Sequence, residues 1–419
     1  PAPEAASIGQ YLVHLFHQAG VPQTALQCVT CKDEQATTII KHPSVKQLVF
    51  TGSNDTAHCL QLLRPTMPII AETGGKNTVI ITEMSDWEQA IQYTIQSAFG
   101  FSGQKCSAAS LMICEKNVYE SPFFKSLLID AVKSLDCGPS SELHNKIVPL
   151  IGPPNERIQQ LLQSLHPKEE WLIRPSLLSE TLLSPGLIWN VQPGSNFFKT
   201  EVFGPILGIC CADDLTHAID IANRSSYGLT AGLHSLDERE QSKWQSQIQA
   251  GNLYINRPST GAIVNRQPFG GIKGSSLGWG LKAGGPNYLL QFSHIEGASD
   301  STLPAIKLSD RTQQFLSHTA VISLNISELP HLANNYEKWA SNFAKPTHLD
   351  TLLGQDNILE YRLRTGIIYR HHASDTLDHI AQFCLASIST NAPIHIMLSR
   401  DTSPKVGAFF TDIIALLPK

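Results

Sequence analysis

The sequence predicts an α/β protein of more than one domain, and three observations carry this prediction. The chain has 419 residues, and a single hydrophobic core stops growing at ~250–300 residues. Short apolar runs typical of buried strands alternate with helical patterns along most of the chain. Near the N-terminus a strand, a glycine-containing turn and a helix follow one another, as they do in half of a nucleotide-binding unit.

The first part of the chain supplies the elements of this half-unit. The sequence AASIGQYLVHLFHQAG has apolar residues at helical spacing, and Gly20 and Pro22 end the helix. A strand is predicted over 45–50, followed by a turn over 51–53 and a helix over 55–63. The runs PIIAETGG and NTVIIT indicate two short buried strands, and residues 86–100 indicate a helix.

The pattern stays mixed after residue 149. LGICC and GNLYIN are typical of strands, and LTHAIDIANRS is typical of a helix. Glycine density marks 268–285 as a loop region, and 297–304 is the best candidate for a linker. Beyond it, TAVISLN, GIIYR and PIHIMLS indicate strands, whereas 329–345, 374–386 and 406–417 indicate helices. These elements predict a second, smaller α/β unit.

Composition narrows the class of function. Apolar residues make up 42% and charged residues 16% of the chain, with a formal net charge of −5. No window approaches the ~18 apolar residues of a membrane-spanning helix, and no basic block with interleaved aromatic residues indicates nucleic-acid binding. We therefore expect a small-molecule substrate, with neither a nucleic acid nor a membrane as partner.

Cysteine usage indicates a reducing, cytoplasmic location. The nine cysteines are odd in number and scattered, and no signal peptide accompanies them. Cys28 and Cys31 have the spacing of a redox motif or half a zinc site, but no second pair follows at zinc spacing. The sixteen histidines form no HExxH motif. We predict no metal site.

The candidate chemistry centres on Cys106 and Glu72. Cys106 lies just beyond a predicted helix, where free backbone amides can hold a thiolate and stabilise an oxyanion. A thiolate nucleophile needs a partner that takes up a proton or activates water, and Glu72 in AETGG is such a carboxylate. The residues alone leave another interpretation open, in which the cysteine is a small buried apolar group and the glutamate is solvated.

Five motifs give the pair a context. FTGSNDTA, ETGGKN, FGFSGQKCSA, EVFGPIL and QPFGGIKGSS occur in this order, and the chain thereby resembles the NAD(P)-dependent aldehyde dehydrogenase superfamily. The resemblance implies that Cys106 is the nucleophile and that Glu72 is the general base that activates the deacylating water. It further implies NAD as cofactor, with residues that contact it: Glu4, Gly52, Ser53, Glu201 and Phe203. Gly52 and Ser53 would lie near the pyrophosphate, and Glu201 would hold the nicotinamide ribose.

A second resemblance narrows the substrate. GNLYINRPSTGAIVNRQPFGG and KAGGPNYLLQF are similar to Δ1-pyrroline-5-carboxylate dehydrogenases, especially to the dehydrogenase half of bifunctional proline utilization A. This implies oxidation of glutamate γ-semialdehyde to glutamate, with Ser107, Gly261 and Ala262 on the substrate's α-carboxylate and amino group and Phe269 on its aliphatic part. STGAIV is also compatible with an ordinary turn.

Other functions remain open at this point. One is a dehydrogenase for a different small aldehyde, and another is a non-catalytic structural module. A cysteine hydrolase is disfavoured because no histidine lies in a recognisable partner motif.

The C-terminal sequence completes the predicted organisation. GQDNILEYRLRTGIIYR resembles part of the Rossmann-like C-terminal domain of longer proline utilization A proteins, which covers the dehydrogenase. We expect a partial NAD-binding domain over 1–73, a catalytic domain over 74–283, an oligomerisation segment and linker over 284–300, and a covering domain over 301–419. The resemblance also implies a homodimer.

The resemblance implies missing parts as well. The family places an oxyanion-hole asparagine and a ribose-binding lysine upstream of the PAPE segment at residues 1–4. A bifunctional parent would also carry a proline dehydrogenase domain with FAD. We therefore expect a truncated chain that has little activity alone, and the choice between NAD and NADP depends largely on the missing part.

Overall fold

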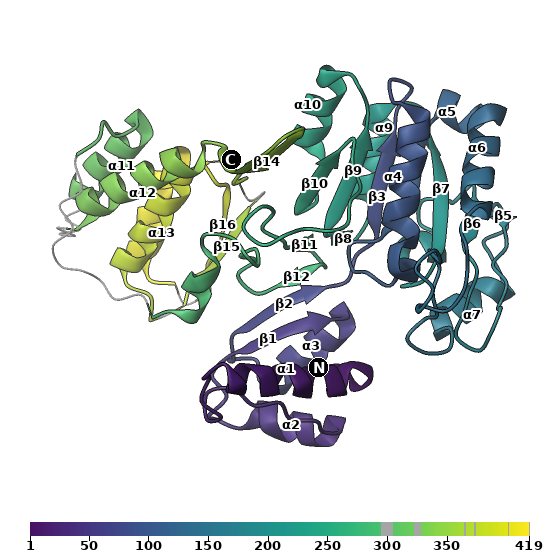
Figure 1. Ribbon diagram of the computed structural model, residues 1–419. Helices are drawn as coiled ribbons and strands as arrows, with labels where there is room; N and C mark the ends of the chain where they lie inside the picture. The colour runs from purple at the N-terminus through teal and green to yellow at the C-terminus, as the bar shows by residue number, and fades with distance from the viewer. Residues whose placement is uncertain (295–304, 322–327, 364–365, 373, 401, 419) are drawn as a thin grey trace. The chain divides into compact units, whose positions relative to one another are not determined.

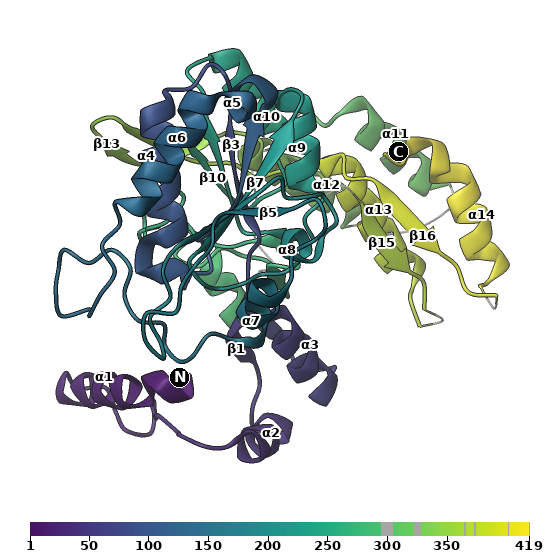
Figure 2. The ribbon, with the colours of Figure 1, turned by 90° about the vertical axis from the view of Figure 1, so that its right-hand side faces the viewer.

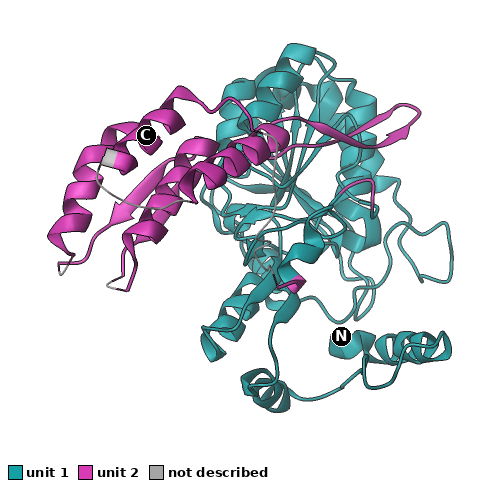
Figure 3. Cartoon of the chain, turned by 90° about the vertical axis from the view of Figure 1, so that its left-hand side faces the viewer, with its two compact units in different colours: residues 1–264, 268–291 teal, residues 265–267, 292–419 magenta. Residues whose placement is uncertain are grey.

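The computed structural model describes residues 1–294, 305–321, 328–363, 366–372, 374–400 and 402–418. Its contacts divide the chain into two compact units, shown in Figure 3. Unit 1 comprises Pro1–Val264 and Pro268–Gln291, and unit 2 comprises Asn265–Gln267 and Phe292–Lys419.

A seven-stranded sheet forms the centre of unit 1 (Figure 1). Its order is β10-β9-β3-β4-β7-β6-β5, and every neighbouring pair is parallel except β5 and β6. The strands are β3 (Asn77–Ile81), β4 (Ala109–Glu115), β5 (Glu170–Ile173), β6 (Gly186–Trp189), β7 (Ile206–Ala212), β9 (Thr230–His234) and β10 (Asn252–Ile255).

Helices cover both faces of this sheet, which is why its central strands are mainly apolar (Figure 2). Ile80 contributes to the core on one face, and its neighbours Val79 and Ile81 contribute to the core on the other. The second face carries α4 (Trp87–Phe99), α5 (Lys116–Glu120) and α6 (Pro122–Lys133); the first carries α7 (Glu156–Gln163), α8 (Asn196–Lys199), α9 (Leu215–Asn223) and α10 (Glu238–Gln247).

A smaller sheet precedes the large one in the chain. Strands β1 (Leu48–Gly52) and β2 (Ile69–Thr73) are parallel and are connected by α3 (Asn54–Leu63). The short strand β12 (Ser276–Leu277) pairs antiparallel with β2, and β8 (Tyr227–Gly228) pairs with β11 (Ile272–Lys273). The predicted strand and helix are therefore confirmed, but the strand begins at Leu48 and extends to Gly52, through two residues of the predicted turn.

The first two α-helices of unit 1 bury little surface. Neither α1 (Ala6–Gln18) nor α2 (Asp33–Lys41) contains a buried residue. Ile8 and Tyr11 of α1 are each 63% exposed. The helix forms at the predicted position, and its apolar side chains remain exposed within the described part of the chain.

Unit 2 is a separate α/β unit with its own core. Its helices α11 (Asp310–Val321), α12 (Leu329–Phe343), α13 (Leu377–Thr390) and α14 (Pro404–Ile413) pack around a core that includes Phe315, Cys384 and Phe409. Strands β15 (Ile367–Arg370) and β16 (Ile394–Met397) are parallel, and β13 (Thr347–Leu352) and β14 (Gln355–Leu359) form a hairpin. The predicted small α/β unit is confirmed.

One predicted strand of unit 2 is wrong where the structure describes it. Thr319–Val321, the start of TAVISLN, ends α11. Phe315 and Thr319 lie one helical turn apart and are both buried, so burial on one helix face decides the conformation. The remainder of TAVISLN and the predicted linker over 297–304 lie outside the described residues.

The predicted oligomerisation segment over 284–300 is described only to residue 294. There it contains a 3-10 helix, η3 (Tyr288–Phe292).

Candidate active site

Cys106 lies in a tight turn between α4 and β4. The helix ends at Phe99, and Phe101 and Ser102 follow with φ angles of +57° and +54°. Such angles are uncommon for residues with a side chain. Ser102 holds this conformation, because its hydroxyl donates to the Val148 carbonyl at 2.6 Å and accepts from the Val148 amide at 2.9 Å. The turn therefore presents the cysteine from a fixed backbone.

Asn77 supports the same turn from β3. Its Nδ2 donates to the carbonyl oxygens of Cys106 at 2.7 Å and Ala108 at 2.9 Å, and its Oδ1 accepts from the Thr230 amide at 3.0 Å. Asn77 is buried, so water cannot take the place of its side chain as the hydrogen-bond partner of these two carbonyls and one amide. One side chain thus joins three neighbouring segments at the nucleophile.

The Cys106 thiol is kept neutral in the resting site. Burial raises its pKa above the ordinary value, and the nearby Glu201 and Glu72 carboxylates raise it further. The backbone amides of Ser107 and Cys106 lower the pKa, as the sequence predicted, but their effect is smaller. Formation of the thiolate therefore requires a group that accepts its proton.

Glu72 is suited to accept a proton near neutral pH. It lies in β2, and its Oε2 accepts from the Gly271 amide at 3.3 Å. Burial raises its pKa to about 7, while the Gly271 amide and the Lys282 ammonium oppose this rise. A Cβ atom at Gly270 would lie 3.0 Å from Glu72 Oε1. The double glycine of QPFGG therefore makes room for this carboxylate.

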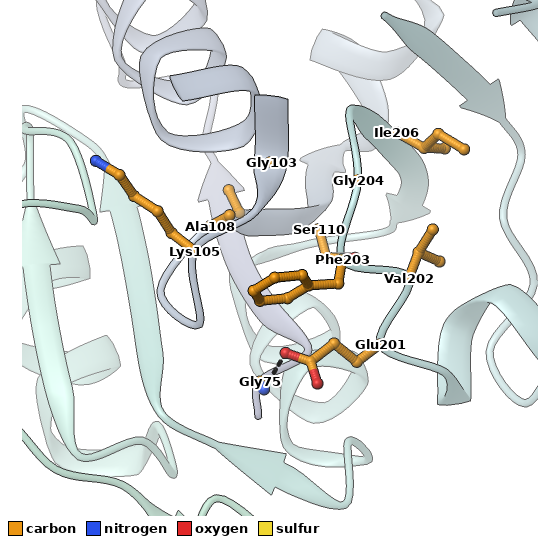
Figure 4. Close-up of a pocket in the computed structure, with 11 residues that line it drawn as sticks. Gly75, Gly103, Lys105, Ala108, Ser110, Glu201, Val202, Phe203, Gly204 and Ile206 are labelled. Atoms are coloured by element: carbon orange, nitrogen blue, oxygen red, sulfur yellow. Dashed lines mark hydrogen bonds between the residues drawn. The ribbon is translucent and has the colours of Figure 1, made fainter. Parts of the chain in front are cut away.

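Glu201 is seated on the backbone that follows Glu72. Its Oε1 accepts from the Gly75 amide at 2.9 Å (Figure 4). Gly74 has a φ of +31°, and a Cβ atom there would overlap Glu201 Oε2. Arg157 Nη1 donates to the Glu201 backbone carbonyl at 2.9 Å. Burial raises the pKa of Glu201 above its usual value, and Gly75, Arg157 and Lys76 oppose that effect.

A cavity separates the Glu201 segment from the Cys106 turn, and Figure 4 shows Glu201, Phe203 and Lys105 around it. Phe203 has a φ of +56° and is 44% exposed. An exposed aromatic ring beside a half-buried carboxylate can pack against a sugar whose hydroxyls donate to that carboxylate.

The predicted phosphate-binding turn lies at the start of α3. Ser53 caps this helix, and its Oγ accepts from the Thr56 amide at 3.1 Å. The Gly74 amide donates to the Gly52 carbonyl at 3.3 Å, which links this turn to the Glu201 seat. Asp55 Oδ2 lies 3.8 Å from Arg157 Nη2. The helix start, the diglycine and Glu201 are therefore connected through direct contacts.

The predicted substrate loop begins beside the nucleophile. Ser107 is buried, and its carbonyl accepts from Ser259 Oγ at 3.5 Å. The Ser259 amide donates to Ser97 Oγ of α4 at 2.9 Å. These contacts place the start of the loop next to Ser107.

The remaining members of the predicted substrate site follow along the chain. Gly261 is exposed with a φ of +91°, and Ala262 is half-buried. Phe269 is half-buried, and its backbone exchanges two hydrogen bonds of 2.9 Å with Ala283.

Glu4, like Gly261, Ala262 and Phe269, shows no hydrogen bond or ion pair with another predicted site residue in the described part of the chain. Glu4 lies in the exposed 3-10 helix η1 (Pro3–Ala5). The described residues contain no group of three or more His, Cys, Asp or Glu side chains that could hold a metal ion, and no helix among them is long and apolar enough to cross a bilayer.

Three polar residues of this site were not predicted. Asn77 and Lys76 belong to the quoted ETGGKN motif, and their position directly after the diglycine was the available signal. Arg157 lies in α7, far along the chain from the motifs, and only the folded structure brings it to Glu201.

Comparison with known proteins places these features in a family. The model of the aldehyde dehydrogenase family matches residues 1–297. The chain is 32% identical over 314 residues to the 1-pyrroline-5-carboxylate dehydrogenase of Geobacillus kaustophilus, covering 72% of this chain and 60% of that protein. The chain thus spans less than two thirds of the length of this relative.

Solved structures agree with the sequence relatives. Proline utilization A (PutA) from Corynebacterium freiburgense matches with a TM-score of 0.88 and 36% identity, covering 96% of this chain and 41% of that one. A Thermus 1-pyrroline-5-carboxylate dehydrogenase with bound NAD matches with a TM-score of 0.65 and 28% identity, covering 70% of this chain and 58% of that one.

Replacement of Asn77 tests the support of the Cys106 turn. Asn77→Ala leaves two carbonyls and one amide buried without their partner, so the free energy of unfolding should fall by about 3 kcal/mol. Urea denaturation followed by tryptophan fluorescence measures this change. Asn117→Ala removes an exposed asparagine that donates to Glu83 and should change stability by less than about 0.5 kcal/mol. Equal effects would contradict the supporting role of Asn77.

Alkylation tests the electrostatics of the nucleophile. The rate of Cys106 modification by iodoacetamide should keep rising above pH 9, because the pKa of the thiol is raised from 9.0. Glu72→Gln removes a negative charge and should move this curve about 0.5–1 pH unit lower. Mass spectrometry of the Cys106 peptide measures the rate, and the exposed Cys59 is the internal control. An unchanged curve would show that Glu72 does not influence the thiol.

Proposed function

The chain belongs to the aldehyde dehydrogenase family, and on this premise we propose that it carries the site for NAD-dependent oxidation of glutamate γ-semialdehyde to glutamate. One observation carries the proposal: the segment from Glu72 to Asn77 contains the proposed base, donates the Gly75 amide to Glu201 and contacts the Cys106 carbonyl through the Asn77 side chain. The similarity to 1-pyrroline-5-carboxylate dehydrogenases and to PutA supports the choice of substrate.

The residues around the cavity fit a dinucleotide. Glu201 offers a carboxylate to the ribose hydroxyls, Phe203 offers an exposed ring, and Gly52 with Ser53 precedes the N-terminus of α3, where a pyrophosphate is favoured. When NAD is bound, its nicotinamide supplies the acceptor for a hydride. We propose NAD as the cofactor because a relative of similar fold has been solved with it.

The first chemical step requires Cys106 to lose its proton. Glu72, with a pKa raised to about 7 by burial, is half ionised near neutral pH and can accept a proton there. The Cys106 sulfur then forms a bond to the aldehyde carbon, and the carbonyl electron pair moves to oxygen. The backbone amides of Cys106 and Ser107 favour negative charge at this turn.

Glu72 acts again after oxidation, when Cys106 carries the acyl group as a thioester. The carboxylate removes a proton from water, whose oxygen attacks the acyl carbon. The carbon–sulfur bond breaks, the carboxylic acid is released, and the sulfur leaves as thiolate. Glu72 gives its first proton to solvent before this step and passes the proton taken from water to the Cys106 thiolate after it, so the resting thiol and carboxylate are restored.

Recognition of the substrate involves the loop that begins at Ser259. We propose that the Ser107 hydroxyl and the backbone at Gly261 and Ala262 bind the α-carboxylate and amino group, while Phe269 packs on the aliphatic part. A carboxylate bound by backbone amides and a hydroxyl needs no arginine. The contact between Ser259 and the Ser107 carbonyl supports this assignment.

The proposal extends to the protein that would contain the chain. The match to PutA covers 96% of this chain but only 41% of PutA. We therefore propose a longer parent protein with a flavin-dependent proline dehydrogenase domain. A homodimer and a cytoplasmic location are part of the same proposal. All nine cysteines are unpaired, which supports a reducing location.

NADH formation from Δ1-pyrroline-5-carboxylate tests the function. The parent protein should form NADH, and Cys106→Ala should lower the rate at least about 10³-fold because the nucleophile is lost. Cys59→Ala, at an exposed position of α3, should leave the rate unchanged. The chain alone should form little NADH, as it spans only part of its relatives. An active Cys106→Ala variant would refute the mechanism.

Ser107 tests the proposed substrate. Ser107→Ala should raise KM for glutamate semialdehyde about tenfold, because a hydrogen bond to a charged group is lost. KM for propionaldehyde, which has no carboxylate, should change less than about twofold on the same grounds. Steady-state kinetics of the parent protein with both aldehydes measures the difference. Equal changes would favour a dehydrogenase for another small aldehyde.

A further inference from the structure

Lys76 is a buried cation that the proposed mechanism does not use. It is 2% exposed, and its Nζ has no hydrogen-bond partner in the described residues. The ammonium lies 3.6 Å from the centre of the Phe197 ring. Burial of an ammonium without a hydrogen bond is unfavourable, so the presence of a lysine at this buried position requires a physical reason.

Lys76 is linked to the Glu201 segment in two ways, through its neighbour Gly75 and through Phe197. Gly75, directly before it, donates to Glu201 Oε1. Phe197, under the ammonium, lies in α8, the short helix that ends just before Glu201. The diglycine seat and the lysine therefore contact the same segment at two points.

The charges around Lys76 are mainly acidic. Glu201 and Glu169 attract the ammonium, and Cys210 of β7 also faces it. Glu169 accepts hydrogen bonds from the backbone amides of Gln192 and His166. It is therefore bound by amides of its own, whereas the Glu201 side chain has one amide, from Gly75.

Glu201 has two cationic neighbours, Lys76 and Arg157. Arg157 donates to the backbone carbonyl of Glu201 and lies 3.8 Å from Asp55, so part of its charge is shared. Tyr227 and Cys106 also lie within the electrostatic range of Glu201. Of these two cations, Lys76 is the one that is buried from solvent. Charges interact more strongly in the protein interior than in water.

We propose that Lys76 is a positioning residue that keeps Glu201 ionised and in place to bind the ribose hydroxyls of the dinucleotide. This inference rests on the proposed function. Burial lowers the pKa of Lys76 to about 7, so its positive charge is present below pH 7 and is lost as the pH rises. The pKa of Glu201 is raised, so the positive charge of Lys76 matters most at low pH, where Glu201 would otherwise take up a proton.

The pH dependence of NAD⁺ binding distinguishes this role from simple packing. Lys76→Met keeps an apolar chain on Phe197 but removes the charge. In the parent protein, isothermal titration calorimetry should show weaker NAD⁺ binding at pH 6.0, by no more than about tenfold, the change that one pKa unit at Glu201 can produce. At pH 8.5, where Lys76 is neutral, the change should be less than about twofold.

Two further variants complete the test. In a Glu201→Gln background, Lys76→Met should change the affinity less than about twofold at either pH, because the two residues act through one interaction. Lys125→Met removes another lysine that lies over an aromatic ring, Trp189, and should leave affinity unchanged.

The outcomes separate the two proposals. A loss that is the same at both pH values, or the same in the Glu201→Gln background, would overturn the role of Lys76 and leave the proposed function intact. If Lys76→Met binds NAD⁺ as tightly as the unaltered protein at pH 6.0, the role of Lys76 is likewise overturned and the proposed function is left intact. If the unaltered parent protein binds no NAD⁺, both proposals are overturned.

Discussion

The hydrogen bond from the Gly75 amide to Glu201 is the interaction on which the site depends. It requires the backbone of the diglycine to approach the carboxylate without a side chain between them. A Cβ atom at Gly75 would also lie 2.7 Å from the Cys106 carbonyl. The same two glycines therefore set the spacing of Glu201 and of the Cys106 turn, and Glu72 and Asn77 lie on either side of them in the chain.

This arrangement explains why chemistry-bearing residues come from distant motifs. β2 ends at Thr73 and β3 begins at Asn77, so the segment between them connects the small sheet to the large one. Residues at this junction can contact α3, the Cys106 turn and the Glu201 segment at once. A junction between two sheets is thus a position where a short segment can organise several groups without a long loop.

Much of this could be predicted from the sequence, because its signals are local. The apolar runs of β3, β4 and β7 are buried on both faces, and Ser53, Asp86 and Asp214 cap helices that the patterns indicated. Helices α12, α13 and α14 and the pair β15 and β16 were equally visible, whereas α11 was not predicted. Thr319–Val321 was mistaken because its β-branched residues are typical of strands, and only packing beside Phe315 shows a helix.

The parts that could not be predicted depend on contacts between distant residues. Arg157 lies 44 positions from Glu201, whose carbonyl it contacts, and α7 carries no motif. The raised pKa of Cys106 is a second example, because the sequence shows the favourable amides beside the cysteine but not the burial and the two carboxylates that outweigh them.

Burial has opposite effects on the ionisable groups of this site, and together they favour a resting state with little charge. It raises the pKa of Glu72 to about 7 and lowers that of Lys76 to about 7. It also keeps the Cys106 thiol protonated. Charge separation inside the protein is costly unless a partner is present. A site with these properties protects its thiol from unrelated electrophiles, since the thiolate that would attack them is scarce.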